Sequence, residues 1–213
     1  RKNNFIIIDS DDKRRVLKSI NKEIPTALLG SEVSKYKNSI MTPSDVKSQA
    51  QGKLYSEIAD IYEKYEEHLL KNNLVDFDDL LLLPYKILKN NQKLAESTSQ
   101  KYQYIMVDEY QDTNELQYRL LRLLCSNHDN LCVVGDDDQS IYGWRGATIK
   151  NILNFNEHFK RATIVKLEEN YRSTDTILHH ANALIEHNRD RLGKKLVGTK
   201  DKGSSIKVYE SHD

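Results

Sequence analysis

Tyr104-Ile105-Met106-Val107-Asp108 is a short apolar run that ends in a carboxylate, a pattern typical of a buried β-strand. The pattern recurs at residues 131–136 and 163–168. Helical patterns separate the three runs, over residues 116–124 and 149–155. Apolar strands that alternate with helices predict an α/β fold, a parallel sheet with helices on both faces. Ligands bind such sheets at the carboxyl ends of the strands, where these acidic residues lie.

The residues before position 74 carry helical patterns. Apolar residues at three- and four-residue spacing predict one long helix over residues 44–70. Ser10 or Asp11 is the expected cap of a shorter helix that ends near Ile20. The tyrosines of the long helix share its apolar stripe, which favours core packing over stacking on nucleic acid. We therefore expect an all-helical N-terminal subdomain.

The end of the chain combines a helix, a basic loop and one more strand candidate. We expect the helix over about residues 174–188, the loop over 189–202 and the strand over 206–209. Earlier in the chain, Pro84 is expected to bend or interrupt the helix that opens near Phe77, because proline cannot donate a helical hydrogen bond.

Composition narrows the function classes. Lysine plus arginine and aspartate plus glutamate each number 32 in the 213 residues, so the formal net charge is zero. Nucleic-acid binding would therefore depend on local charge placement. No apolar run approaches the roughly 20 residues of a membrane span, which excludes a membrane anchor. Cys125 and Cys132 occur without a secretory signal, so we expect two reduced, buried thiols in a cytoplasmic protein.

Asp108 and Glu109 directly follow the first strand candidate. Two adjacent carboxylates at the end of a buried strand are typical of a Walker B site, in which the first holds Mg²⁺ and the second polarises the attacking water. The alternative is that both side chains only cap a helix at the edge of the sheet.

Three sequence blocks carry a resemblance to a known family. They are VDEYQDTN at residues 107–114, VGDDDQSIYGWRGA at 134–147 and LEENYRST at 167–174. In this order and spacing they resemble motifs II, III and IV of the UvrD/Rep-type superfamily 1 DNA helicases. Shorter matches are DFDDL at 76–80, ANALI at 181–185 and RLGKKL at 191–196. The resemblance is close from about residue 74 to 210 and weak in the helical first third.

The resemblance implies an organisation and an activity. Residues 1–73 would be a helical insert, subdomain 1B. Residues 74–168 would be the C-terminal part of a partial RecA-like motor domain, 1A, and residues 169–213 the start of motor domain 2A. The implied activity is that of an ATP-dependent helicase that moves 3′ to 5′ on single-stranded DNA and unwinds duplexes at junctions. ATP and Mg²⁺ are the implied cofactors.

The resemblance also implies roles in the nucleotide site. Asp108 would organise Mg²⁺, and Glu109 would be the general base that also faces the metal. Gln139 would contact the γ-phosphate, Arg172 would stabilise the charge that develops during phosphoryl transfer, and Tyr171 would stack on adenine. The alternatives are that Gln139 is a turn residue and Arg172 forms a surface ion pair.

The aromatic residues of the second block are the implied DNA contacts. Tyr142 and Trp144 would stack on single-stranded DNA, with Arg145 beside them. The alternative for Trp144, the sole tryptophan, is core packing. Because Gln139 and Trp144 share one loop, loss of the γ-phosphate would change the grip on a base and drive a ratchet along the strand.

The P-loop that such a motor needs, G-x-x-x-x-G-K-[ST], does not occur in the sequence. Residues 193–200 have the glycine spacing, but Thr and Lys stand in reversed order. Since the chain opens with Arg1, we expect it to be a fragment whose P-loop precedes residue 1, and we predict that it neither hydrolyses ATP nor unwinds DNA alone. Two other functions stay open: the motor part of a helicase-nuclease, and an ATP-independent module that binds single-stranded DNA or docks proteins.

Overall fold

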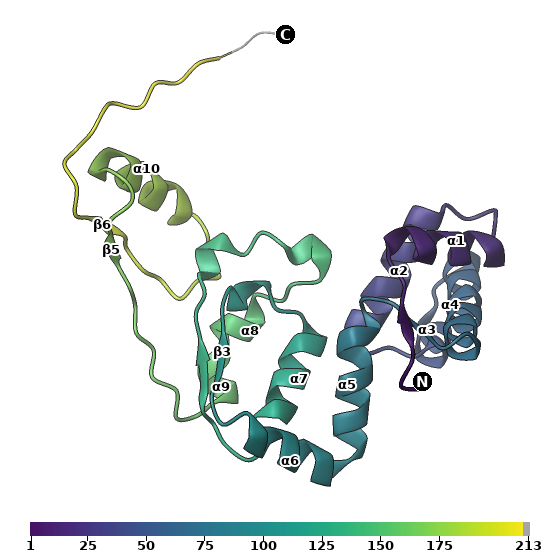
Figure 1. Ribbon diagram of the computed structural model, residues 1–213. Helices are drawn as coiled ribbons and strands as arrows, with labels where there is room; N and C mark the ends of the chain where they lie inside the picture. Colours follow the sequence, from purple (N-terminus) through teal and green to yellow (C-terminus); the bar gives the residue numbers. More distant parts are fainter. Residues whose placement is uncertain (211–213) are drawn as a thin grey trace.

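The computed structural model describes residues 1–210, apart from the side chain of Arg145. Figure 1 shows three parts in chain order: a helical unit that contains the N-terminus, an α/β unit, and a C-terminal segment that extends away from the other two. No helix of the described residues is long and apolar enough to cross a membrane.

The helical unit has four helices and one pair of short strands. Its elements are β1 (Ile6–Ile7), α1 (Ser10–Ile20), α2 (Thr26–Asn38), α3 (Pro43–Gln49), α4 (Lys53–Lys71) and β2 (Leu74–Val75). The two strands are parallel, with Ile6 opposite Leu74. They join the beginning and the end of the unit, a pairing that the helical patterns of this region do not predict.

Helix boundaries differ from the sequence predictions at two places. Asp9 caps α1 in place of Ser10 or Asp11, because its side chain accepts a hydrogen bond from the Asp11 amide at 2.9 Å. The helix predicted over residues 44–70 is two helices, α3 and α4. Gly52 separates them with φ 90°, a backbone conformation that favours glycine.

One apolar core holds the helical unit together. Leu17 of α1, Leu29 of α2 and Ile58 of α4 are fully buried in it. Tyr62 and Tyr65 of α4 are buried with them, which confirms that these tyrosines pack in the core.

The α/β unit places helices around a parallel pair of strands. Its elements are α5 (Asp79–Asn90), α6 (Gln92–Lys101), β3 (Ile105–Val107), η1 (Tyr110–Asp112), α7 (Glu115–Leu124), β4 (Leu131–Val133), η2 (Asp137–Gln139), η3 (Gly143–Arg145), α8 (Lys150–Leu153) and α9 (Phe155–His158). Helix α5 continues through Pro84, so the predicted interruption is wrong. Leu82 and Tyr85 of α5 pack with Leu116 of α7, and this burial outweighs the one missing hydrogen-bond donor.

The strand pair confirms the α/β class and the parallel direction. β3 and β4 pair in parallel, with Ile105 opposite Leu131. Helix α7 lies between the two strands in the chain. The third strand, predicted over residues 163–168, is absent from the described sheets. Val165 in that stretch is 74% exposed and lies alongside no strand. Cys125 is buried and Cys132 is exposed, both as free thiols, so the expected burial of Cys132 is wrong.

The C-terminal segment contains β5 (Glu169–Asn170), α10 (Asp175–Ile185) and β6 (Val197–Gly198). β5 and β6 form the third parallel pair of the described residues. The strand predicted over residues 206–209 does not form, and Val208 there is 90% exposed. An apolar stretch with no neighbouring strand cannot satisfy its backbone groups within a sheet.

Lys37 of α2 connects the helical unit to the α/β unit. Its Nζ lies 2.8 Å from Asp79 and 3.0 Å from Asp76, and its side chain is fully buried. Glu66 of α4 adds a third carboxylate at 2.8 Å. The sequence block DFDDL therefore supplies two of the three carboxylates that pair with Lys37 in this buried ion cluster. The domain boundaries expected at residues 73 and 168 stay predictions.

Candidate functional site

The chain turns sharply after β3 and exposes the two carboxylates expected to act on ATP. Asp108 accepts a hydrogen bond from the amide of Glu109 at 2.9 Å. Glu109 has φ 50° and ψ 42°, the left-handed conformation, which is uncommon for a residue with a side chain. Such backbone strain persists only where the surroundings hold it, which points to a constrained role for this turn.

Both carboxylates line a groove of about 310 Å³ between β3, α5 and α7. Its other lining residues include Leu81, Asp112 and Gln117. One carboxylate oxygen of Asp112 is buried and has no hydrogen-bond partner among the described residues. The groove thus gathers three carboxylates, one of which holds an oxygen free for a ligand.

Gln111 connects the strand end to the next loop. Its Nε2 donates to Glu109 Oε2 at 2.7 Å, and its Oε1 accepts from the backbone amide of Asp136 at 3.0 Å. The neighbouring Tyr110 anchors the turn, since its ring is buried edge-on against Phe155 at 5.6 Å. Burial raises the pKa of Tyr110 to about 12.

Gly135, two residues after the end of β4, allows this connection. A Cβ at this position would lie 2.7 Å from Gln111 Oε1 and 2.9 Å from the Cδ1 of Ile152. Both distances are shorter than ordinary contacts, so a side chain here would push Gln111 away. The contact of Gln111 with the loop after β4 therefore requires that position 135 has no side chain.

Asp136 holds Gln139, the expected γ-phosphate contact. Gln139 Nε2 donates to Asp136 Oδ2 at 2.6 Å, and Lys194 pairs with the other oxygen. Partial burial acts to raise the pKa of Asp136, but the hydrogen bonds from Lys194 and Gln139 outweigh it, and the pKa is lowered. The Asp136 side chain is therefore an ionised carboxylate that bonds to both Gln139 and Lys194.

The basic loop expected over residues 189–202 closes on three neighbouring aspartates. Arg191 makes two hydrogen bonds to Asp138, at 2.9 and 2.7 Å, and the amide of Leu192 donates to Asp137 at 2.7 Å. Oxygens of the three aspartates lie within 4.8 Å of one another, close enough to surround a cation. Protein cations already pair with them, so this cluster serves as an intramolecular ion-pair site.

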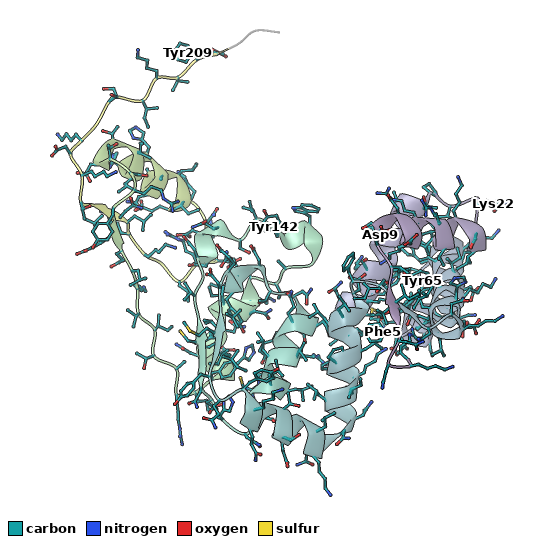
Figure 2. The ribbon with its side chains drawn as sticks, in the orientation of Figure 1. Phe5, Asp9, Lys22, Tyr65, Tyr142 and Tyr209 are labelled. Carbon is teal, nitrogen blue, oxygen red and sulfur yellow. The ribbon has the colours of Figure 1, made fainter. Side chains whose placement is uncertain are left out.

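Tyr142 and Trp144 lie in the loop that follows, in and beside η3. Their ring centroids are 6.3 Å apart at an angle of 47°, and Trp144 is 75% exposed. Core packing of the tryptophan is thus ruled out. Figure 2 shows Tyr142 in this projecting loop. Arg145 ends η3, and its side chain lies outside the described part of the structure.

Tyr171 and Arg172 lie apart from this arrangement. Both follow β5 and are exposed, and Tyr171 donates a hydrogen bond to Glu169. Among the described residues no hydrogen bond or ion pair joins either side chain to Asp108 or Glu109. The structure brings together the residues of the first two sequence blocks and leaves those of the third on the C-terminal segment.

Three residues near the site carry contacts that the sequence does not reveal. Gln111 and Asp112 lie in the block at residues 107–114, but the hydrogen bonds of Gln111 and the place of Asp112 in the groove depend on tertiary structure. Gly135 lies inside the run at 131–136, and a glycine within a strand pattern indicates close approach of another segment. The sequence contains this pattern, but it does not show that Gln111 is the residue that approaches.

Comparison with known proteins places the chain in a family. Residues 1–160 match the family model of the UvrD/REP helicase N-terminal domain, and residues 165–213 match that of the UvrD-like helicase C-terminal domain. The ATP-dependent DNA helicase PcrA of Staphylococcus epidermidis is 42% identical over 98% of the chain, and that of Staphylococcus aureus is 43% identical over the same share. The chain spans 30% of the length of each of these relatives. By these matches, the chain belongs to the UvrD/REP helicase family.

Proposed function

We propose that the chain supplies the catalytic carboxylates and the DNA-gripping loop of an ATP-dependent DNA helicase that moves 3′ to 5′ on single-stranded DNA. One observation carries the proposal. Glu109, which follows Asp108 after β3, is joined through Gln111 by hydrogen bonds to the loop that contains Asp136 and Gln139. The same loop continues to the exposed Trp144. The relatives named above are ATP-dependent DNA helicases, and the chain is similar to them over nearly its whole length.

The donor atoms of the groove fit Mg²⁺. This ion prefers oxygen ligands and retains water, so it binds through one or two carboxylates. Asp108 would hold it, with Glu109 nearby, and the unpartnered oxygen of Asp112 offers a further acceptor for metal-bound water. When bound, the ion would neutralise charge on the phosphates of ATP.

The chain's own residues supply the remaining chemistry. Glu109 is proposed to accept a proton from the attacking water. Gln139 must exchange its bond to Asp136 for one to phosphate oxygen, which an uncharged amide can donate without disturbing the carboxylates. Arg172 and Tyr171 would reach the nucleotide when the C-terminal segment moves toward the groove.

Movement on DNA would follow from the shared loop. A change in the partner of Gln139 alters the start of the loop, and Trp144 lies a few residues further along. Stacking of a base on an exposed aromatic ring contributes roughly 1 to 3 kcal/mol. A modest displacement of the indole therefore changes the grip on a base enough to release it. Action at duplex junctions and a cytoplasmic location are parts of the same proposal.

ATP turnover tests the proposal in the full natural polypeptide that carries this chain. We expect hydrolysis that single-stranded oligothymidylate stimulates, with Glu109→Gln lowering kcat by about a hundredfold or more, because general-base catalysis contributes this much. Glu115→Gln is the matched control, since Glu115 pairs with Arg119 on the exposed face of α7. Equal turnover in the Glu109→Gln variant and the wild type would contradict the assignment. The 213 residues alone are expected to show no turnover.

A further inference from the structure

Among the described residues, Gln111 is the one side chain that hydrogen-bonds both to Glu109 and to the loop after β4. Its amide uses both of its functions: the NH₂ group donates to the carboxylate of Glu109, and the carbonyl accepts from the amide of Asp136. These two partners follow different strands, β3 and β4. A single side chain thus spans the gap between the two strand ends.

The position of Gln111 is enclosed on several sides. Its side chain is 1% exposed. Gly135 lies against its Oε1, and the hydroxyl of Ser140 donates to its backbone carbonyl. A buried amide with both functions bonded has one orientation, because rotation would leave a polar atom unpaired at considerable cost.

This geometry restricts Glu109. The carboxylate follows a backbone in the left-handed conformation and would otherwise rotate freely at an exposed turn. The bond from Gln111 fixes one of its oxygens. The same side chain holds the amide of Asp136, whose carboxylate binds Gln139. A displacement on either strand is therefore passed to the other through one rigid amide.

We propose that Gln111 is a positioning residue that orients Glu109 to accept a proton from the water that attacks ATP, and that it couples Glu109 to the loop of Gln139. The proposal rests on the function proposed above. Only glutamine satisfies the geometry among similar side chains: glutamate has no donor for Glu109, leucine has neither function, and asparagine is one methylene shorter.

Two substitutions separate the two bonds. Gln111→Glu keeps an acceptor for the Asp136 amide and replaces the donor to Glu109 with a like charge. Gln111→Leu removes both bonds. Gln92→Glu is the matched control, because Gln92 also donates its amide to a glutamate, Glu96 at 2.8 Å, on the exposed surface of α6. Gly135→Ala tests the same connection without changing Gln111.

The first measurement is steady-state ATP hydrolysis by the full natural polypeptide. We expect Gln111→Glu and Gly135→Ala to lower kcat by about ten- to hundredfold, the effect of losing one hydrogen bond to a charged group. The KM for ATP is expected to stay within about twofold, since Gln111 contacts no nucleotide in this scheme. Gln92→Glu should leave both constants unchanged. The proposal would be overturned by a folded Gln111→Glu variant with the kcat of the wild type, whether or not its KM for ATP is raised.

The second measurement is hydrogen exchange at the Asp136 amide in the 213-residue chain, which requires no ATP turnover. Exchange should accelerate by at least about tenfold in Gln111→Leu and stay near the wild-type rate in Gln111→Glu. Unchanged exchange in Gln111→Leu would show that the connection does not exist. If the wild type hydrolyses no ATP, the proposed function fails, and the exchange rates still decide whether Gln111 joins the two strand ends.

Discussion

Lys37→Met tests whether the buried ion cluster holds the helical unit against α5. Methionine is unbranched and reaches the position of the lysine Cε, but it lacks the ammonium group with its charge and its donors. The side chain of Lys37 is fully buried, as are those of its partners Asp76 and Asp79. Without the cation, two carboxylates remain buried close together with too few partners.

The structure sets the size of the effect. Breaking a buried ion pair by removing one partner costs about 3 to 5 kcal/mol. Lys13 lies 3.4 Å from Asp76 and compensates part of the loss. We therefore expect the free energy of unfolding to fall by about 3 kcal/mol, the lower end of that range, a large share of the roughly 5 to 15 kcal/mol that stabilises a domain.

The assay is urea unfolding of the 213-residue chain, followed by far-ultraviolet circular dichroism. Lys47→Met is the matched control, because Lys47 pairs with Asp60 at 2.6 Å on the surface and half of each side chain faces solvent. This control should leave the midpoint nearly unchanged. A loss below about 1 kcal/mol for Lys37→Met, the size expected of a surface pair, would refute the claim that this cluster is a desolvated junction.

Two further predictions concern charged groups. Burial acts to raise the pKa of Asp76, but the charges of Lys37 and Lys13 together with the hydrogen bonds to the carboxylate outweigh it, so the folded pKa lies below the usual 3.8. The stabilisation is complete above about pH 4 and declines as the pH falls through the lowered pKa. Asp76→Asn should remove this part of the acid transition in unfolding measured against pH. Arg191→Glu should release the basic loop from Asp138 and accelerate hydrogen exchange at the Leu192 amide. The double variant Arg191→Glu with Asp138→Arg, which swaps the two charges, should restore slow exchange. If exchange stays fast in the double variant, the ion pair does not hold the loop.

Local patterns predicted those elements that depend on local contacts. The apolar run at 104–108 and the leucines of α7 form the expected strand and helix. The strand is only partly buried, however, because Met106 is 78% exposed. The run at 163–168 has the same composition but forms no strand, since a strand requires a hydrogen-bonded neighbour that composition cannot specify. At Gly52 the sequence pattern predicts too much regular structure. The helical spacing of apolar residues continues across this position, but the backbone turns there and the helix ends.

In the candidate site, too, the sequence predicts the residues but not the contacts between remote segments. Asp108, Glu109 and Gln139 were recognised from motif blocks, and the structure places them at two adjoining strand ends. Their mutual distances depend on pairs remote in sequence, such as Asp136 with Lys194. No sequence pattern predicts that Gln111 binds the Asp136 amide. This hydrogen bond joins two loops, and their distance depends on the register of β3 and β4.

The dependence of DNA affinity on nucleotide tests the central claim most directly. Fluorescence anisotropy of a labelled oligothymidylate would be measured with the full natural polypeptide, with and without a non-hydrolysable ATP analogue, and with Trp144→Ala. We predict that the analogue shifts the affinity of the wild type several-fold and that Trp144→Ala weakens binding by about five- to hundredfold, the equivalent of one stacked base. An affinity that is identical with and without the analogue would contradict a nucleotide-driven motor and favour a module that binds single-stranded DNA without ATP.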